Sequence, residues 1–216
     1  MIITEQKPVN KILESLIEYK NIFLVGCGEC ATTCKTGGEP ELKAMKELLE
    51  KEGKTVSGMC LPEAPCVAGK IKIELAKNMK YLREAEAILV LACGLGVQST
   101  KDNDRIGLPV FPACDTLFGA IMDAQSNFYE KCSMCGECVL DVTAGICPVT
   151  LCAKGLLNGP CGGMNKGKCE VDSEKDCAWV LIYKELEKGG RLDKMRATSA
   201  PKDYKKVLKP RKKILA

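Results

Sequence analysis

The feature of this 216-residue chain that most constrains its fold is the crowding of cysteine in its C-terminal half. Eight of its fifteen cysteines lie between Cys132 and Cys177, and the chain contains no histidine. Glycine, proline and asparagine dominate this stretch, which is too poor in apolar residues for an ordinary core. Metal sites are therefore expected to hold it folded, because the free energy of ligand binding replaces missing burial in small cysteine-rich domains.

The most specific chemical motif is the C-x2-C-x2-C triplet formed by Cys132, Cys135 and Cys138. This spacing presents three thiolates to one iron-sulfur cluster from a single loop, and a remote fourth cysteine closes such a site in bacterial ferredoxins. Gly136 lets the backbone approach the cluster closely. The sequence therefore predicts an iron-sulfur cluster at this triplet.

The spacing leaves the fourth ligand open. In ferredoxins a Cys-Pro pair follows within about four residues, whereas Cys147-Pro148 comes nine positions after Cys138. The candidates are the five later cysteines, Cys147, Cys152, Cys161, Cys169 and Cys177. A fourth ligand for the triplet would use only one of these five cysteines. Because eight cysteines make two four-thiolate sites, we expect about two [4Fe-4S] clusters here.

The N-terminal part of the chain alternates helices with strands. Apolar periodicity predicts helices over residues 9–20, 40–53 and 71–82, and strands over residues 22–25, 55–59, 87–92 and 108–111. This alternation is typical of α/β proteins with a parallel, doubly wound, Rossmann-like sheet. We expect that domain over residues 1–125, a ferredoxin-like iron-sulfur domain with a closing helix over 126–190, and a basic C-terminal tail over 191–216.

Cysteines also follow the predicted strands, where open α/β sheets gather their ligands. The strand-end cysteines are Cys27, Cys60, Cys93 and Cys114. A thiolate site built from Cys27, Cys30 and Cys34 and closed by Cys60, Cys66, Cys93 or Cys114 accounts for this pattern. Zinc and an iron-sulfur cluster both accept four thiolates, so the metal stays open.

The N-terminal cysteines have two other interpretations. Free cysteine is often buried and behaves as a small apolar residue, so some of them could simply fill the core. The run from Gly26 to Ala31 also fits the dinucleotide fingerprint G-x-G-x-x-A. Met59-Cys60 stands where that fingerprint needs a ribose-binding acid, which makes nucleotide binding the weaker hypothesis.

The C-terminal tail is strongly basic. Residues 191–216 contain ten Lys and Arg and two Asp, a local net charge of +8, whereas the whole chain carries +4. We expect a solvated tail; the alternatives are an arm that binds an acidic partner or nucleic acid. Nucleic acid is disfavoured because Tyr204 is the one aromatic residue in this tail.

Several function classes find no support in the sequence. Without histidine, the usual activating base of serine and cysteine hydrolases is missing. No apolar run approaches the roughly 18 residues of a membrane span, and the first residues lack the features of a signal peptide. We expect a cytoplasmic protein with reduced thiols, in which Trp179 packs inside the metal domain.

Several motifs of the chain occur together in one known family. They are the triplet, Gly145-Ile-Cys147-Pro-Val-Thr, the turn Asn158-Gly-Pro-Cys161-Gly-Gly, Lys168-Cys169-Glu, and Asp176-Cys177-x-Trp179. With them the chain resembles the methylenetetrahydrofolate reductase C-terminal-domain family. The motif Gly-Cys27-Gly-x-Cys30-Ala-x-x-Cys34 is also similar, so the resemblance covers about residues 20–185.

The resemblance implies a small accessory subunit like the MetV-type iron-sulfur and zinc subunits of acetogens. Such a subunit binds a flavin-containing methylenetetrahydrofolate reductase catalytic subunit and passes electrons to its flavin in one-carbon metabolism, the acetyl-CoA pathway. A ferredoxin or another redox subunit would supply the electrons. Nothing in the chain resembles the folate-binding barrel, so we expect no catalysis by this subunit alone.

The resemblance also implies two sets of ligands. The cluster ligands would be Cys132, Cys135, Cys138, Cys147, Cys152, Cys161, Cys169 and Cys177. The further metal site would use Cys27, Cys30, Cys34 and a strand-end cysteine, Cys60 or Cys93. Two alternative functions stay open: a structural zinc-thiolate scaffold, and an electron-transfer subunit of another anaerobic oxidoreductase.

Overall fold

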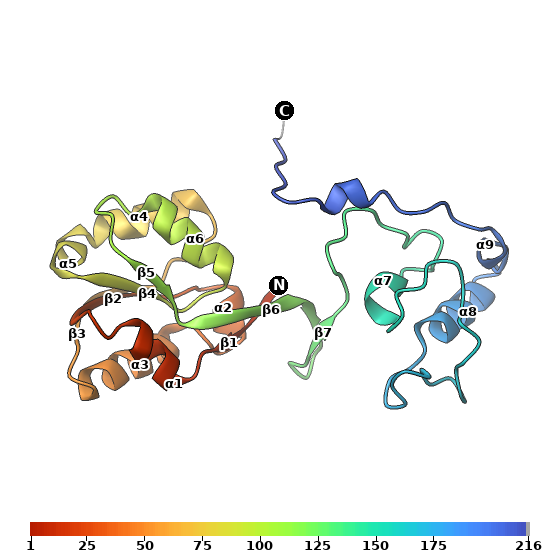
Figure 1. The fold of residues 1–216 in the computed structure, drawn as a ribbon, viewed down its shortest axis with the longest axis horizontal. Coiled ribbons are helices and arrows are strands. Elements are labelled where there is room, and N and C mark those ends of the chain that lie inside the picture. The colour runs from red at the N-terminus through yellow and green to blue at the C-terminus, as the bar shows by residue number, and fades with distance from the viewer. Residues whose placement is uncertain (215–216) are drawn as a thin grey trace. The chain divides into compact units, whose positions relative to one another are not determined.

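The structure is a computed structural model that describes residues 1–214 (Figure 1). The chain divides into two compact units, Met1–Phe118 and Gly119–Ala216. The predicted domain boundary at residue 125 falls inside the second unit. The last two residues of the predicted basic tail, 215 and 216, lie outside the described part.

The first unit is built on a four-stranded parallel sheet with the strand order β3-β2-β4-β5. Its strands are β2 (Asn21–Val25), β3 (Thr55–Cys60), β4 (Ala87–Val90) and β5 (Val110–Pro112). Its helices are α1 (Val9–Ser15), α2 (Cys30–Thr33), α3 (Glu39–Lys51), α4 (Ala68–Lys77), α5 (Met79–Glu84) and α6 (Gly94–Asn103). The predicted α/β class with a parallel sheet is confirmed.

The side chains of β2 alternate between the two faces of this sheet. Ile22 and Leu24 pack with the apolar residues of α1 and α3. Phe23 and Val25 pack with those of α4 and α5. All four side chains are fully buried, which explains the unbroken apolar run, because a parallel sheet covered on both faces needs apolar residues at every position.

The strand order places a topological switch point between β2 and β4. From β2 the chain passes through α3 to β3 on one side, whereas β4 leads through α6 to β5 on the other. In open α/β sheets, ligands bind in the crevice outside the carboxyl ends of the strands at such a point. Cys27 and Cys93 follow these two strands.

Parts of the first unit differ from the sequence-based prediction. The structure adds strand β1 (Ile2–Gln6) and helix α6, neither of which was predicted. The single helix predicted over residues 71–82 is divided into α4 and α5 at Asn78, which caps both helices with φ −99° and ψ 14°.

The second unit has little regular structure. Strand β6 (Cys114–Met122) runs across the unit boundary and pairs antiparallel with β7 (Phe128–Glu130), in a sheet of order β1-β6-β7. The helices are α7 (Pro148–Leu151), α8 (Ala178–Lys188), α9 (Asp193–Arg196) and the 3-10 helix η1 (Tyr204–Val207). Helix α8 is the predicted closing helix, but the ferredoxin-like fold is not confirmed.

The core of the second unit is small and centres on α8. Cys177, Trp179, Ile182 and Leu186 are its buried residues. Trp179 is 5% exposed, and its Nε1–H donates a hydrogen bond of 3.1 Å to Leu156 O. The prediction that Trp179 packs inside this part of the chain is confirmed. Among residues 1–214, no helix has the length and apolar character needed to cross a bilayer.

Candidate metal centres

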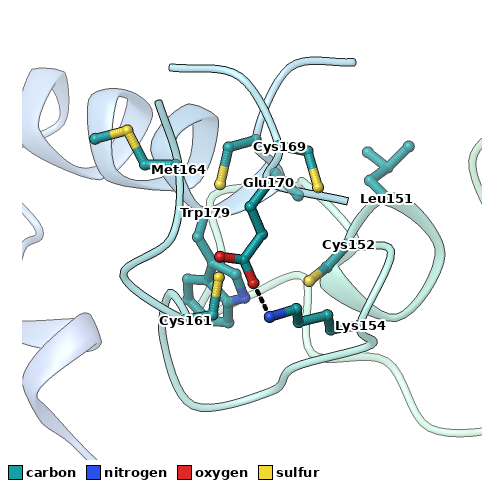
Figure 2. Close-up of a pocket in the computed structure, with 10 residues that line it drawn as sticks. Leu151, Cys152, Lys154, Cys161, Met164, Cys169, Glu170 and Trp179 are labelled. Atoms are coloured by element: carbon teal, nitrogen blue, oxygen red, sulfur yellow. Dashed lines mark ion pairs between the residues drawn. The ribbon is translucent and has the colours of Figure 1, made fainter. Parts of the chain in front are cut away.

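Four cysteines of the second unit line a single pocket beside α8 (Figure 2). Cys152 caps the end of α7 and Cys177 caps the start of α8, whereas Cys161 and Cys169 come from irregular loops. Cys177 is buried, and Cys161 is exposed to solvent. The pocket thus collects the soft sulfur ligands that zinc and iron-sulfur clusters prefer.

The carboxylate of Glu170 reaches into this pocket and forms an ion pair with Lys154. Figure 2 shows the sulfurs of Cys152 and Cys161 on either side of that carboxylate in its view. The side chains of Lys154 and Glu170 are 41% and 32% exposed, so their ion pair contributes little stability. Glu170 can therefore turn toward solvent at small cost.

The cysteine triplet lies on an irregular loop after β7. Met134 and Gly136 have φ angles of +54° and +80°, left-handed conformations that turn the backbone sharply. The Met134 N–H donates to Cys132 Sγ over 3.3 Å. Amide donors that face sulfur are among the groups that stabilise clusters and tune their potentials.

Cys147 is the one cysteine of the eight that neither belongs to the triplet nor lines the pocket. It caps the start of α7, and its thiol donates to Thr150 Oγ1 over 3.6 Å. Between Cys138 and Cys147 the chain makes a tight turn, in which Gly145 N–H donates to Leu140 O over 2.8 Å.

Most of the basic tail is exposed to solvent, as expected, but residues 202–211, the strap, contact the triplet loop through a few side chains. Lys202 is 8% exposed, and its Nζ donates to Glu137 O. Arg211 Nη1 donates to Met134 O over 3.1 Å. This contact could not be predicted from spacing, since the two segments are more than 60 residues apart in the chain.

The strap also changes the chemistry of the triplet. Burial acts to raise the pKa of the Cys135 thiol. Hydrogen bonds from the Glu137 backbone and the Lys202 side chain outweigh this effect, together with the Lys202 charge, so that the pKa is lowered from its usual value. A lowered pKa favours the thiolate, which is the form that binds metal.

Three cysteines of the first unit gather at the switch point: Cys27 after β2, Cys30 at the start of α2, and Cys93 at the cap of α6. Burial raises the pKa of the Cys27 thiol, although backbone hydrogen bonds with Ala31 and Glu29 act in the opposite direction. Negative charge at Cys30 or Cys93 would act on this pKa in the same direction as burial, so both residues lie within electrostatic reach of Cys27.

Cys66 belongs to the same group of thiols. Burial raises its pKa, and so do the nearby thiolates of Cys93 and Cys30. Cys34 lies beside β1, where its thiol donates to Ile2 O over 3.9 Å and the Ile2 N–H donates to Cys30 Sγ over 3.4 Å. Cys66 is one of the four cysteines that the sequence analysis offers as the fourth ligand of this site.

Cys60 and Cys114 lie in the core of the first unit. Cys60 packs with Phe23 on one face of the sheet, and Cys114 packs with Leu89 on the other. Burial is the main reason why the pKa of each thiol is raised to about 12. Both thiols therefore stay protonated near neutral pH in this arrangement.

Within residues 1–214, no group of three or more Cys, Asp or Glu side chains is arranged so that it could hold one metal ion. The cysteines of the pocket face a common space without meeting at a single ion position. The donor set of four thiolates nevertheless fits a larger cluster, because each sulfur then binds a different iron atom.

Residues 111–205 match the family model described as methylene-tetrahydrofolate reductase C terminal. This match covers the triplet, the pocket and the first four residues of the strap. No curated protein and no solved structure gives a significant match. The resemblance found in the sequence is confirmed for this segment.

Proposed function

Because residues 111–205 belong to the methylene-tetrahydrofolate reductase C-terminal family, we propose that the chain is the iron-sulfur electron-transfer subunit of a methylenetetrahydrofolate reductase complex. It would pass electrons to the flavin of the catalytic partner subunit, and a ferredoxin or another redox subunit would supply them. The observation that carries this proposal is the pocket lined by four cysteines, in the same unit as the cysteine triplet.

The eight cysteines divide naturally into two sets of four. The pocket accounts for Cys152, Cys161, Cys169 and Cys177. Cys132, Cys135, Cys138 and Cys147 are then left for the other site, with Cys147-Pro148 in the role of the Cys-Pro pair that follows a ferredoxin triplet. Bound at these sites, [4Fe-4S] clusters would each take up and release one electron.

A cluster and a zinc scaffold would differ in the spacing of their ligand sulfurs. Four sulfurs around one zinc ion stand about 3.8 Å apart, since a tetrahedral site has Zn–S bonds of about 2.3 Å. A [4Fe-4S] cube holds its ligand sulfurs farther apart. The distances between the four pocket sulfurs in the metal-loaded protein would therefore distinguish the two kinds of site.

Electron transfer to a flavin tests the proposal directly. The chain is purified under anaerobic conditions, its iron, sulfide and zinc are counted, and it is reduced and mixed with an oxidised flavin-containing methylenetetrahydrofolate reductase subunit. We expect broad visible absorption from iron-sulfur clusters and rapid bleaching of the flavin; chain stripped of iron serves as the control. A protein that holds only zinc would be the scaffold instead. Iron-loaded protein that leaves this flavin oxidised would point to another oxidoreductase.

We also propose a separate thiolate metal site at the switch point of the first unit, holding zinc or a third cluster. Cys27, Cys30 and Cys93 are its favoured ligands, and Cys34 and Cys60 are the other candidates from the sequence. The position of Cys66 beside Cys30 and Cys93 makes it the favoured fourth ligand over the core residue Cys60.

Two matched variants test this site. Replacing Cys66 with serine is expected to remove the metal of the first unit, because the site loses a thiolate. Replacing the buried Cys60 with serine is expected to leave this metal bound. The free energy of unfolding should fall by roughly 1–2 kcal/mol because the packing around residue 60 changes. Zinc and iron per chain are measured by elemental analysis. Metal loss in the Cys60 variant alone would make Cys60 the ligand.

A further inference from the structure

The strap holds a buried positive charge against the cysteine triplet. Lys202 is 8% exposed, which is rare for lysine unless it is paired. Its Nζ donates to Glu137 O, the same carbonyl oxygen to which the Cys135 thiol donates over 3.7 Å. Among the described residues, the salt bridges of this region do not include Lys202.

A buried ammonium without a close carboxylate is costly and needs a compensating negative charge. The nearby carboxylate of Glu137 is engaged elsewhere: its Oε2 accepts from Asp203 N–H over 2.7 Å, and its Oε1 pairs with Lys206 Nζ over 3.2 Å. Glu137 and Lys202 attract one another electrostatically, but among the described residues no ion pair joins them, so thiolate sulfurs at the triplet would bring a further negative charge close to Lys202.

The strap is also held at several points, so Lys202 cannot easily move away. Arg211 binds Met134 O, and Gly136 faces Lys206 so closely that a Cβ at Gly136 would lie 2.9 Å from Lys206 Cβ. The left-handed φ of +80° at Gly136 adds a second reason for glycine at that position. These contacts fix the charge of Lys202 relative to Cys135.

We propose that Lys202 is a positioning residue that compensates the charge of the cluster held by the triplet and raises its reduction potential. This inference rests on the proposed function. On reduction one electron enters the cluster, which becomes more negative by one charge. A fixed positive charge stabilises that reduced state more than the oxidised state, and burial strengthens the effect by lowering the effective dielectric.

Redox titration of the anaerobically purified full chain, followed by electron paramagnetic resonance, tests this role. In Lys202→Gln we expect one of the two clusters to become harder to reduce. Its ratio of reduced to oxidised cluster at a fixed potential should fall about tenfold, which is about 59 mV for a one-electron couple. Lys202→Arg keeps the charge and should titrate like the unmodified protein.

Lys205→Gln is the matched control, because it removes a charge from the exposed side of the same segment. It is expected to leave both potentials unchanged. A Lys202→Gln variant with full iron and unchanged potentials would overturn the inference alone, whereas an unmodified chain without iron would overturn the proposed function with it. If Lys202→Gln loses iron, a full iron content in Lys202→Arg would support the role of charge. Loss of iron in both variants would contradict that role.

Discussion

Replacing Cys161 with alanine is expected to remove about four iron atoms per chain and about half of the visible cluster absorption, because one four-thiolate site loses a ligand. Cys161 is suited to this test because its side chain is exposed, so its removal leaves the core intact. Iron and sulfide analysis of anaerobically purified protein measures the effect. The cluster at the triplet should keep its resonance spectrum in the reduced protein.

Glu170→Gln is the matched control for this variant. The residue lines the same pocket, and its ion pair with Lys154 is partly exposed, so the change should cost less than about 1 kcal/mol of stability. We expect it to retain all iron. Full iron in the Cys161 variant would remove Cys161 from the ligand set, and equal loss in both variants would assign the effect to the pocket's structure.

Removing the metal from the whole protein is expected to unfold the second unit while the first unit stays folded. The two faces of the parallel sheet give the first unit two buried cores, whereas the core of the second unit is small and includes the proposed ligand Cys177. Metal binding therefore supplies much of the folding free energy of the second unit.

The single tryptophan makes this outcome measurable. Trp179 is the one tryptophan in the sequence and is 5% exposed, so its fluorescence reports on the second unit alone. After oxidation and chelation we expect its emission to shift to longer wavelength as the indole meets water. Far-ultraviolet circular dichroism should retain the helical signal of the first unit. An unchanged emission wavelength after complete iron loss would show that the second unit folds without metal.

Much of the first unit could be predicted because its strands are short apolar runs between helices. The runs around Phe23 and Leu89 gave strands β2 and β4, since every position is buried. Helix α6 was missed because it opens with Gly94 and Gly96, and its buried residues are Gly96 and Thr100 instead of large apolar ones. Strand β1 was missed because two of its five residues, Glu5 and Gln6, are polar and exposed, and Thr4 is polar as well.

The sequence identifies the candidate ligand residues, but it does not show which of them lie together in one site. The triplet spacing is local and can be recognised in the sequence. The grouping of Cys152 with Cys161, Cys169 and Cys177 depends on how irregular loops meet beside α8, and spacing does not encode that. The contact of Lys202 with the triplet loop could not be predicted for the same reason, because its partner Glu137 is 65 residues away in the chain.

The contact between the strap and the triplet has a consequence for assembly. The ribosome makes Cys138 before Lys202, with 64 positions between their numbers. At about 5–20 residues per second, the triplet loop exists without the strap for about 3–13 s. The nascent chain thus offers this loop to the machinery that delivers iron and sulfide before Lys202 and Arg211 contact it, whereas Cys132 and Cys138 stay exposed in the finished chain.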